Sequence, residues 1–304
     1  MKNVVIAAYV RSPQTFAHKG ALATLRPDTL VSQVIAGLVS KTGIDSGSLE
    51  DIIMGCAFPE GEQGLNIARL SGLMAGIPNS VAGVTVNRLC GSSMQAIHMA
   101  AGAIQMNAGE AFICAGVESM SRIPMGGYNP MPNPALFNTL PAAYISMGET
   151  AENVAKQYQL SRSQQDEFAI ASQQKAAAAQ QQGRFKDEII PIDCDSIIVE
   201  MDGCIRANTS IEEMAGLKPA FSTDGTVTAA NSSPLTDGAS ATLVCSEEYA
   251  IQNKLTPLAR INTIGVSGCA PETMGLGPIF ATKKALERAS LTITDIDIIE
   301  INEA

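Results

Sequence analysis

Buried strands alternate with amphipathic helices along the first 120 residues, and this alternation restricts the fold more than any other feature of the chain. The apolar runs have the length of strands buried on both faces and lie at residues 4–10, 51–56, 81–86 and 111–117. Residues 28–42 carry apolar side chains at helical spacing and stop at Gly43, and residues 66–75 do the same before Gly76. This pattern is typical of βαβ units, so we expect an α/β protein with a largely parallel sheet covered by helices.

The alternation stops after residue 119. Pro, Met, Gly and Asn replace periodic apolar residues between Met120 and Pro141, which indicates a loop that leaves the sheet. Capping boxes that begin at Ser146 and Ser161 predict two helices, the second ending at Gly183. Sheet-like sequence returns within residues 225–245. The last predicted elements are a strand at 258–266, a helix at 278–289 and a strand at 297–301.

Cys90 is the candidate nucleophile. It lies between the apolar strand predicted at 81–86 and a helix rich in Met, Ala and Ile, both of which we expect to be buried. Unpaired N–H groups and the positive end of the helix dipole favour thiolate over thiol at such a junction. The same N–H groups can hold an oxyanion that forms beside the sulfur. The alternative is an inert core cysteine.

A base for this nucleophile is harder to find, because the chain holds only two histidines, His18 and His98. His98 lies on the same predicted helix, about 12 Å from Cys90 at ~1.5 Å per residue, which is too far to take its proton. We expect His98 to be a core residue with satisfied hydrogen bonds, and His18 to lie in a surface loop. The chain therefore offers a nucleophile and no base.

Composition excludes several classes of function. A net charge of −10 argues against nucleic acid or an anionic membrane surface as the main partner. Seven cysteines without a CxxC pair argue against a disulfide framework or a zinc site, and favour a reducing compartment such as the cytoplasm. The apolar run at 4–10 is too short to cross a bilayer, so we expect no membrane span.

Several longer segments resemble the thiolase family, from the first strand to the last residue. These segments are VNRLCGSSMQA around Cys90, GVESMS, SMGETAENVA, SRSQQDEFAIASQQKA, GRFKDEIIPI, GTVTAANSSPLTDGASA, TMGLGP and the terminal EINEA. The residues around Cys90 are most similar to those of bacterial 3-ketoacyl-CoA thiolases of fatty acid β-oxidation. Biosynthetic acetoacetyl-CoA thiolases are near neighbours.

The resemblance implies the thiolase fold, in which βαβαβαββ layers of helix and mixed sheet are duplicated, with the second copy incomplete here. It implies an N-terminal thiolase domain at 1–119 and a loop domain that faces CoA at 120–237. Residues 238–257 would return to the sheet of the first domain. Residues 258–304 would start the C-terminal thiolase domain.

The resemblance also implies an acyltransferase that works on 3-ketoacyl-CoA, with coenzyme A as substrate and without a bound cofactor or metal. Cys90 would attack the keto carbonyl, release acetyl-CoA and hold the shortened chain as a thioester until a second CoA removes it; the reverse reaction is a Claisen condensation. Asn302 would position a water in the oxyanion hole. The residues implied to contact CoA are Ser233, Met147 and Phe221 at the pantetheine, Met274 near the reactive centre and Arg206 near the nucleotide phosphates.

The partners implied for a complete chain are CoA thioesters, a second copy in a homodimer or homotetramer, and a hydratase/dehydrogenase subunit of a β-oxidation complex. The family's activating histidine, in a Gly-His-Pro segment, and its second cysteine, in a Cys-x-Gly segment, are expected beyond Ala304. We therefore expect the 304-residue chain to show no thiolysis by itself. Two alternatives remain: a catalytically silent CoA- or acyl-CoA-binding module, and a structural partner that pairs through the thiolase dimer surface.

Overall fold

One sheet organises the first of two units into which the chain divides in a computed structural model that describes residues 2–304. This unit holds the residues up to Pro130 together with Arg184–Cys204 and Leu235–Asn262. Its strands run in the order β4-β3-β5-β8-β1-β9, and β2 pairs with β8. Their bounds are β1 (Val4–Arg11), β2 (Thr15–Phe16), β3 (Asp51–Gly55), β4 (Ala82–Val86), β5 (Ala111–Ser119), β8 (Thr236–Ser246) and β9 (Ala259–Arg260).

The sheet is mixed, as the thiolase resemblance implies, so the largely parallel sheet expected from the βαβ pattern alone was wrong. β3 is parallel to β4 and β5, as the βαβ pattern predicts. β8, however, enters between β5 and β1 and is antiparallel to both. It arrives after the long excursion from residue 120 to 235, so no single crossover helix fixes its direction.

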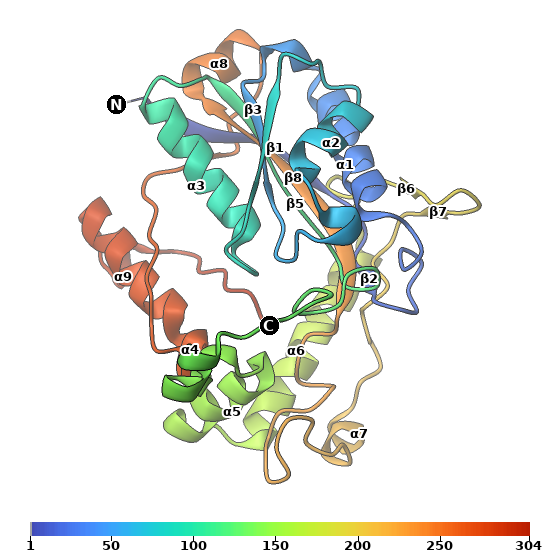
Figure 1. Cartoon of the computed structure of the whole chain (residues 1–304), viewed down its shortest axis with the longest axis vertical. Helices are drawn as coiled ribbons and strands as arrows, with labels where there is room; N and C mark the ends of the chain where they lie inside the picture. The colour runs from blue at the N-terminus through green and yellow to red at the C-terminus, as the bar shows by residue number, and fades with distance from the viewer. Residues whose placement is uncertain (1) are drawn as a thin grey trace. The chain divides into compact units, whose positions relative to one another are not determined.

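Helices cover both faces of the sheet (Figure 1). One face packs against α1 (Pro27–Thr42) and α2 (Ile67–Met74), and the other packs against α3 (Ser92–Gln105). Side chains of β5 alternate between the two cores: Ala111, Ile113 and Ala115 belong to the core under α1, and Phe112 and Cys114 to the core under α3. This alternation is the two-residue period of a strand buried on both faces.

The predicted ends of the first helices are confirmed. α1 stops at Gly43, whose φ of 64° is the left-handed conformation that glycine adopts without strain. α2 begins after Asn66, whose side chain accepts a hydrogen bond from the Arg69 N–H, and the chain turns at Gly76 with a φ of 78°. α8 (Glu247–Gln252) follows β8 directly.

α3 and β4 are less buried than expected. β4 is an edge strand, and its residues are half-buried or exposed. α3 buries one face through Ala96, Ala100 and Ile104, whereas Met94 on the same helix is 62% exposed. Both elements therefore present apolar side chains at the surface of this unit.

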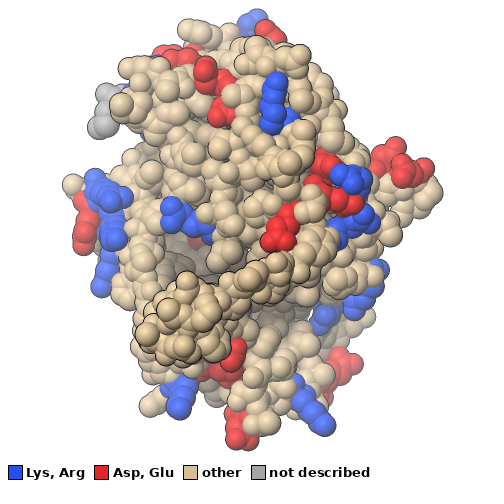
Figure 2. Space-filling model, in the orientation of Figure 1, with Lys and Arg blue, Asp and Glu red and all other residues tan. Residues whose placement is uncertain are grey.

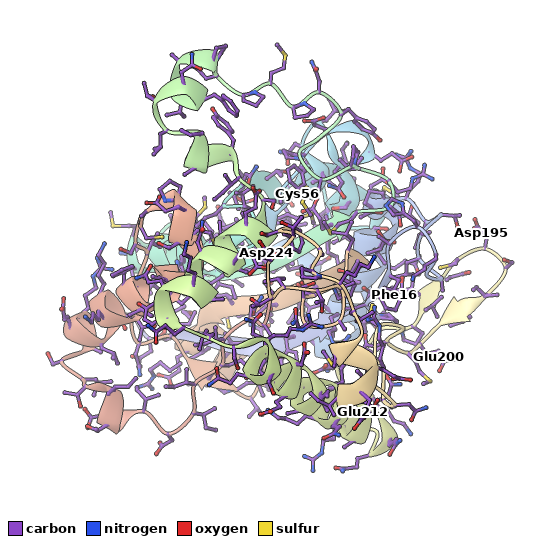
Figure 3. The ribbon with its side chains drawn as sticks, turned by 90° about the horizontal axis from the view of Figure 1, so that it is seen from below. Phe16, Cys56, Asp195, Glu200, Glu212 and Asp224 are labelled. Atoms are coloured by element: carbon purple, nitrogen blue, oxygen red, sulfur yellow. The ribbon has the colours of Figure 1, made fainter. Side chains whose placement is uncertain are left out.

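A two-stranded hairpin in the first unit joins β6 (Ile192–Asp193) to β7 (Ile198–Val199). Asp195 lies in its turn (Figure 3) with a φ of 63°, and its N–H bonds to Asp193 Oδ1 at 3.0 Å. Such local side-chain bonding is what makes Asp a common turn residue.

The second unit is mainly helical and holds Met131–Gly183, Ile205–Pro234 and Thr263–Ala304. Its α-helices are α4 (Pro134–Thr139), α5 (Met147–Tyr158), α6 (Arg162–Gln181), α7 (Ile211–Ala215) and α9 (Gly277–Ala289). The capping boxes predicted at Ser146 and Ser161 are confirmed, and Gly183 follows α6 with a φ of 68°. α4 lies in the segment predicted as a loop and begins after Asn133, whose side chain accepts from two N–H groups of the first turn.

The strand predicted at 258–266 is mostly absent, since only Ala259 and Arg260 form β9. Leu258 and Ile261 bond to β1 through their N–H groups, and residues 263–266 lie against α9. The Arg288 guanidinium donates to the Ile264 carbonyl at 2.7 Å, and Lys284 Nζ donates to the Val266 carbonyl at 3.2 Å. Side chains of a helix thus satisfy carbonyls that a neighbouring strand would otherwise satisfy.

The strand predicted at 297–301 was also wrong. These residues form no strand, and Ile298 is 85% exposed. An apolar run of this length becomes a strand only where another strand pairs with it, and no strand within residues 2–304 pairs with it. Residues 225–235 are irregular as well, because Glu152 accepts the Thr226 and Val227 N–H groups, each at 2.8 Å.

Asp237 joins the two points where the chain leaves and re-enters the sheet. Its carboxylate is fully buried in β8 and accepts from the Ser119 hydroxyl at 3.0 Å, the Ser121 N–H at 2.9 Å and the Ser121 hydroxyl at 2.5 Å. Three donors therefore depend on one buried acceptor.

We expect Asp237→Asn to destabilise the first unit by about 2 kcal/mol, because the amide group cannot accept from all three donors. Asp187→Asn is the matched control, since Asp187 is exposed in the same unit and the substitution removes the same charge. Urea unfolding followed by circular dichroism measures the difference. Equal unfolding midpoints for the two variants would contradict this account.

Candidate active site

Cys90 lies in an exposed turn between β4 and α3. It immediately precedes Gly91, the N-cap residue of α3, as the sequence predicts. Leu89 has a φ of 47°, a left-handed conformation that costs a residue with a Cβ atom about 1 kcal/mol or more. The thiol is therefore held at the positive end of a helix by a backbone that strains one residue.

Ser92 closes this turn. Its hydroxyl accepts from the Arg88 N–H at 2.8 Å and donates to the Leu89 carbonyl at 2.5 Å. The Gly91 and Ser92 N–H groups bond back to the carbonyls of Arg88 and Leu89 at 3.1 and 3.0 Å. The side chain of Ser92 is buried, so its hydrogen bonds hold the turn from the protein interior while Cys90 stays exposed.

Two glycines let α3 begin directly on the sheet. A Cβ atom on Gly55, the last residue of β3, would lie 2.3 Å from the backbone nitrogen of Ser93. A Cβ atom on Gly116 of β5 would lie 2.8 Å from the Ser93 Cβ. Any larger residue at either position would push the first turn of α3, and Cys90 with it, away from the strand ends.

All seven cysteines are free thiols, and Cys90 is exposed whereas the other six are buried or half-buried. Burial, with a smaller effect of Glu118, raises the pKa of the Cys56 thiol to about 12. Burial, with a smaller effect of Glu110, raises the pKa of Cys245 to about 12, and burial raises the pKa of Cys114 as well. These three thiols are protonated and inaccessible near neutral pH.

The two histidines do not supply a base in this turn. His98 is half-buried on α3, and burial, followed by the charge of Arg88, lowers its pKa. Its Nδ1 is buried without a hydrogen-bond partner in residues 2–304, so the expectation of a satisfied core histidine was wrong. His18 is exposed in a turn, as predicted, and its N–H donates to the Ser121 hydroxyl.

The remaining predicted site residues belong to the second unit, whereas Cys90 belongs to the first. Met147 is the first residue of α5 and is 44% exposed. The ring of Phe221 lies over Gly148, where a Cβ would meet it at 2.2 Å. The same ring borders a pocket of about 340 Å³ lined by Ile145, Glu149, Glu152, Asn153, Phe221 and Ser222.

Met274 lies in the 3₁₀ segment Pro271–Leu276, which packs against α5. One bond of that contact runs from the Asn153 amide to the Glu272 carbonyl at 2.9 Å. The structure therefore brings Met147, Phe221 and the Met274 segment to one helix.

Ser233 lies beside the end of the chain. Its N–H donates to the Ala304 carbonyl at 3.1 Å, so Ser233 contacts the segment that carries Asn302, which is exposed. Arg206 is exposed as well, and its N–H donates to the Gln173 side chain at 2.7 Å.

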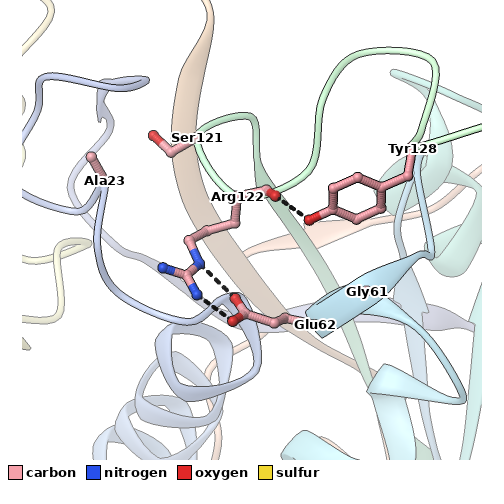
Figure 4. Close-up of a pocket in the computed structure, with 6 residues that line it drawn as sticks. All are labelled: Ala23, Gly61, Glu62, Ser121, Arg122 and Tyr128. Carbon is pink, nitrogen blue, oxygen red and sulfur yellow. Dashed lines mark hydrogen bonds and ion pairs between the residues drawn. The ribbon is translucent and has the colours of Figure 1, made fainter.

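A second pocket, of about 360 Å³, lies within the first unit and contains no predicted site residue (Figure 4). Arg122 forms a two-point ion pair with Glu62 there, with one bond at 2.7 Å, and the Tyr128 hydroxyl donates to the Arg122 carbonyl. Hydrogen bonding to Arg122 lowers the pKa of Glu62. Because its cation is neutralised within the pocket, this site does not favour an anionic ligand.

On the face drawn in Figure 2, acidic and basic side chains lie singly or in small mixed groups. Among residues 2–304, no group of three or more His, Cys, Asp and Glu side chains could hold a metal ion. No helix in this range has both the length and the apolar character needed to cross a membrane.

Sequence reasoning missed the residues that hold Cys90 in place. Gly55 and Gly116 each lie near the carboxyl end of a strand, where glycine often marks a close backbone approach. The second small residue after Cys90, Ser92, carried a similar signal because Ser side chains bond to nearby backbone groups. Both signals can be read from the sequence, but only the contact of α3 with β3 and β5 shows that these residues position Cys90.

We expect iodoacetamide to alkylate Cys90 fastest of the seven cysteines near neutral pH, because alkylation follows thiolate fraction and access. Cys269 and the other half-buried thiols should follow, and Cys56, Cys114 and Cys245 should react only on unfolding. Time-resolved peptide mapping measures the order. Faster labelling at Cys269 would place the reactive thiol elsewhere.

We expect Gly55→Ala to destabilise the chain by about 2 kcal/mol and to slow Cys90 alkylation, because the added methyl displaces the backbone of Ser93. Gly102→Ala is the control, because Gly102 lies in α3 with open space around its missing side chain. That change should raise stability by up to about 1 kcal/mol and leave alkylation unchanged. Thermal unfolding and peptide mapping on both variants decide the matter.

Comparison with known proteins assigns the family. The chain matches the family described as thiolase, N-terminal domain, over residues 4–248 and the thiolase C-terminal domain over residues 255–304. It is 43% identical to a 3-ketoacyl-CoA thiolase of Bacillus subtilis over 100% of this chain and 81% of the relative, and 45% identical to one of Photobacterium profundum over 100% and 80%. The crystal structure of the Bacillus anthracis acetyl-CoA acetyltransferase superimposes with a TM-score of 0.90 at 38% identity, covering 100% of this chain and 80% of that one. The fold, the motif around Cys90 and these matches together show that the chain belongs to the thiolase family.

Proposed function

We propose that this protein transfers acyl groups between 3-ketoacyl-CoA and CoA through a thioester on Cys90. The observation that carries the proposal is the exposed Cys90 thiol at the start of α3, in a turn fixed by Ser92 and seated on Gly55. The two relatives named as 3-ketoacyl-CoA thiolases support this substrate class. Family matches that cover nearly the whole chain do not favour a silent CoA-binding module or a purely structural role.

The chemistry follows from the position of the thiol. The Cys90 thiolate adds to the keto carbonyl carbon, and we place the backbone N–H of Cys90 beside the oxyanion, since the Gly91 and Ser92 N–H groups are bonded within the turn. The bond from that carbon to C2 then breaks, C2 takes up a proton, and acetyl-CoA leaves. The CoA thiol loses a proton, its sulfur attacks the thioester carbonyl, and Cys90 leaves as thiolate. The proton lost by CoA balances the one gained by C2.

The second unit would bind CoA. We place the pantetheine arm at Met147, Phe221 and Ser233, and the nucleotide phosphates at Arg206, because Arg is well suited to phosphate oxygens. Met274 would lie near the reactive centre, and Asn302 would position a water in the oxyanion hole. The pocket bordered by Phe221 and the bond from Ser233 to the last residue support this assignment.

Exposed apolar side chains around β4 support a homodimer, or a homotetramer built from such dimers. β4 is an edge strand, whose outer backbone groups can pair with another chain. Leu65 is 92% exposed near it, and Met74 and Met94 on the adjacent helices are 52% and 62% exposed. The seven free thiols favour a cytoplasmic location.

Acyl trapping tests the proposal. After incubation with acetyl-CoA, which passes its acetyl group to Cys90 and releases CoA without breaking a carbon–carbon bond, and rapid quenching in acid, mass spectrometry of the peptide that contains Cys90 should find an acetyl thioester. Cys90→Ser should remove this adduct, because a Ser hydroxyl lacks the low pKa of a thiol.

Cys269→Ser is the matched control, since it also replaces one accessible thiol and should leave the Cys90 adduct intact. An acetyl group found on Cys269, or on no cysteine, would refute the assignment of Cys90 as the nucleophile.

A further inference from the structure

We propose that Asn87 and Glu118 are positioning residues that hold Cys90 in its reactive geometry, acting in series through the backbone of Ala57. This inference rests on the proposed function, in which Cys90 is the nucleophile. Ala57, Asn87 and Glu118 lie at the carboxyl ends of β3, β4 and β5, three adjacent strands of the first unit.

The Asn87 side chain fixes the backbone of Leu89, the residue before Cys90. Its Oδ1 accepts from the Leu89 N–H at 2.8 Å, which fixes the turn in which Leu89 takes its φ of 47°. Residues 87–90 are all exposed in this unit. The turn is therefore held by its hydrogen bonds more than by packing around it, and the bond to Leu89 opposes return to a relaxed backbone.

The other end of the Asn87 side chain is tied to the next strand. Its Nδ2 donates to the Ala57 carbonyl at 2.8 Å. Ala57 lies just beyond β3, next to Cys56, which is labelled in Figure 3 and whose N–H bonds to the Val86 carbonyl at 3.1 Å. The orientation of Asn87 thus depends on where the backbone of Ala57 is held.

Glu118 holds Ala57. Its Oε2 accepts from the Ala57 N–H at 2.7 Å, and its Oε1 accepts from the Gln63 side chain at 2.6 Å. Gln63 is fully buried, and its own Oε1 accepts from the Ser119 N–H at 2.7 Å. Glu118 is therefore held by the buried Gln63 side chain, and it in turn fixes the position of the Ala57 backbone.

The path from Glu118 to Cys90 is continuous. It runs from the Glu118 carboxylate to the Ala57 N–H, from the Ala57 carbonyl to Asn87, and from Asn87 to Leu89, the neighbour of Cys90. Neither Asn87 nor Glu118 has to touch substrate for this role. Loss of either residue should leave Cys90 present and accessible but less often in its reactive geometry.

The experiment compares the iodoacetamide alkylation rate of Cys90 in wild-type chain, Asn87→Ala, Glu118→Gln and the double variant, by peptide mapping. Glu118→Gln keeps the shape of the side chain but puts an NH₂ group where one oxygen accepts. Each single variant should slow Cys90 labelling about tenfold, as expected if the reactive turn loses about 1.4 kcal/mol. The double variant should be no slower than the singles, because residues in series share one path.

Asn66→Ala is the matched control. Asn66 also bonds the strand next to it, donating to the Gly83 carbonyl at 2.7 Å, and it caps α2, so its loss should lower stability without changing Cys90 labelling. Labelling of buried Cys114 reports any unfolding, and Cys269 in the second unit serves as an internal standard. Asn87 is exposed, so Asn87→Ala keeps the test available if Glu118→Gln does not fold.

Wild-type labelling rates in both single variants would overturn the inference, as would multiplied effects in the double variant. Failure of the proposed function has a different signature. In that case Cys90 of the wild-type chain would label more slowly than Cys269, whatever the variants do.

Discussion

The close packing of the first turn of α3 on the ends of β3 and β5 is the contact on which the site depends. Gly55 and Gly116 leave no side chain between the strands and Ser93, so the helix begins at the surface of the sheet. The Cys90 turn is thereby placed at the carboxyl edge of the parallel strands. This edge is where open α/β sheets commonly bind ligands, because loops and helix N-termini converge there.

A second constraint, the buried Asp237 carboxylate, fixes the sheet where the chain leaves it after β5 and returns in β8. β8 inserts between β5 and β1 in antiparallel register, and Asp237 fastens its start to Ser119 and Ser121. The exit and the return of the chain are therefore joined at one buried carboxylate. Because this junction is closed within the first unit, the sheet does not rely on the inserted segments for its own pairing.

Much of this fold could be predicted because local pattern and tertiary environment agree. The strands at 51–56 and 111–117 lie in a buried sheet, and the capping boxes at Ser146 and Ser161 are satisfied within their own helices. The position of Cys90 before a helix followed from the same local pattern.

The failures share a physical cause, which is dependence on a distant partner. The direction of β8 is set by its neighbours in the sheet. Residues 263–266 bond to side chains of α9, and residues 297–301 have the composition of a strand without a strand to pair with in the described chain. A strand is a pairwise structure, so an apolar run alone does not make one.

The site shows the same dependence at the level of single side chains. Leu89 is a poor choice for a left-handed position on its own, since its Cβ crowds the following carbonyl oxygen at positive φ. It is held there by the Asn87 side chain, and Asn87 is held in turn by the backbone of the neighbouring strand. Strain next to the nucleophile thus persists only because the ends of β3 and β4 are already fixed in the sheet. The reactive geometry of an exposed thiol is in this way a property of the buried fold beneath it.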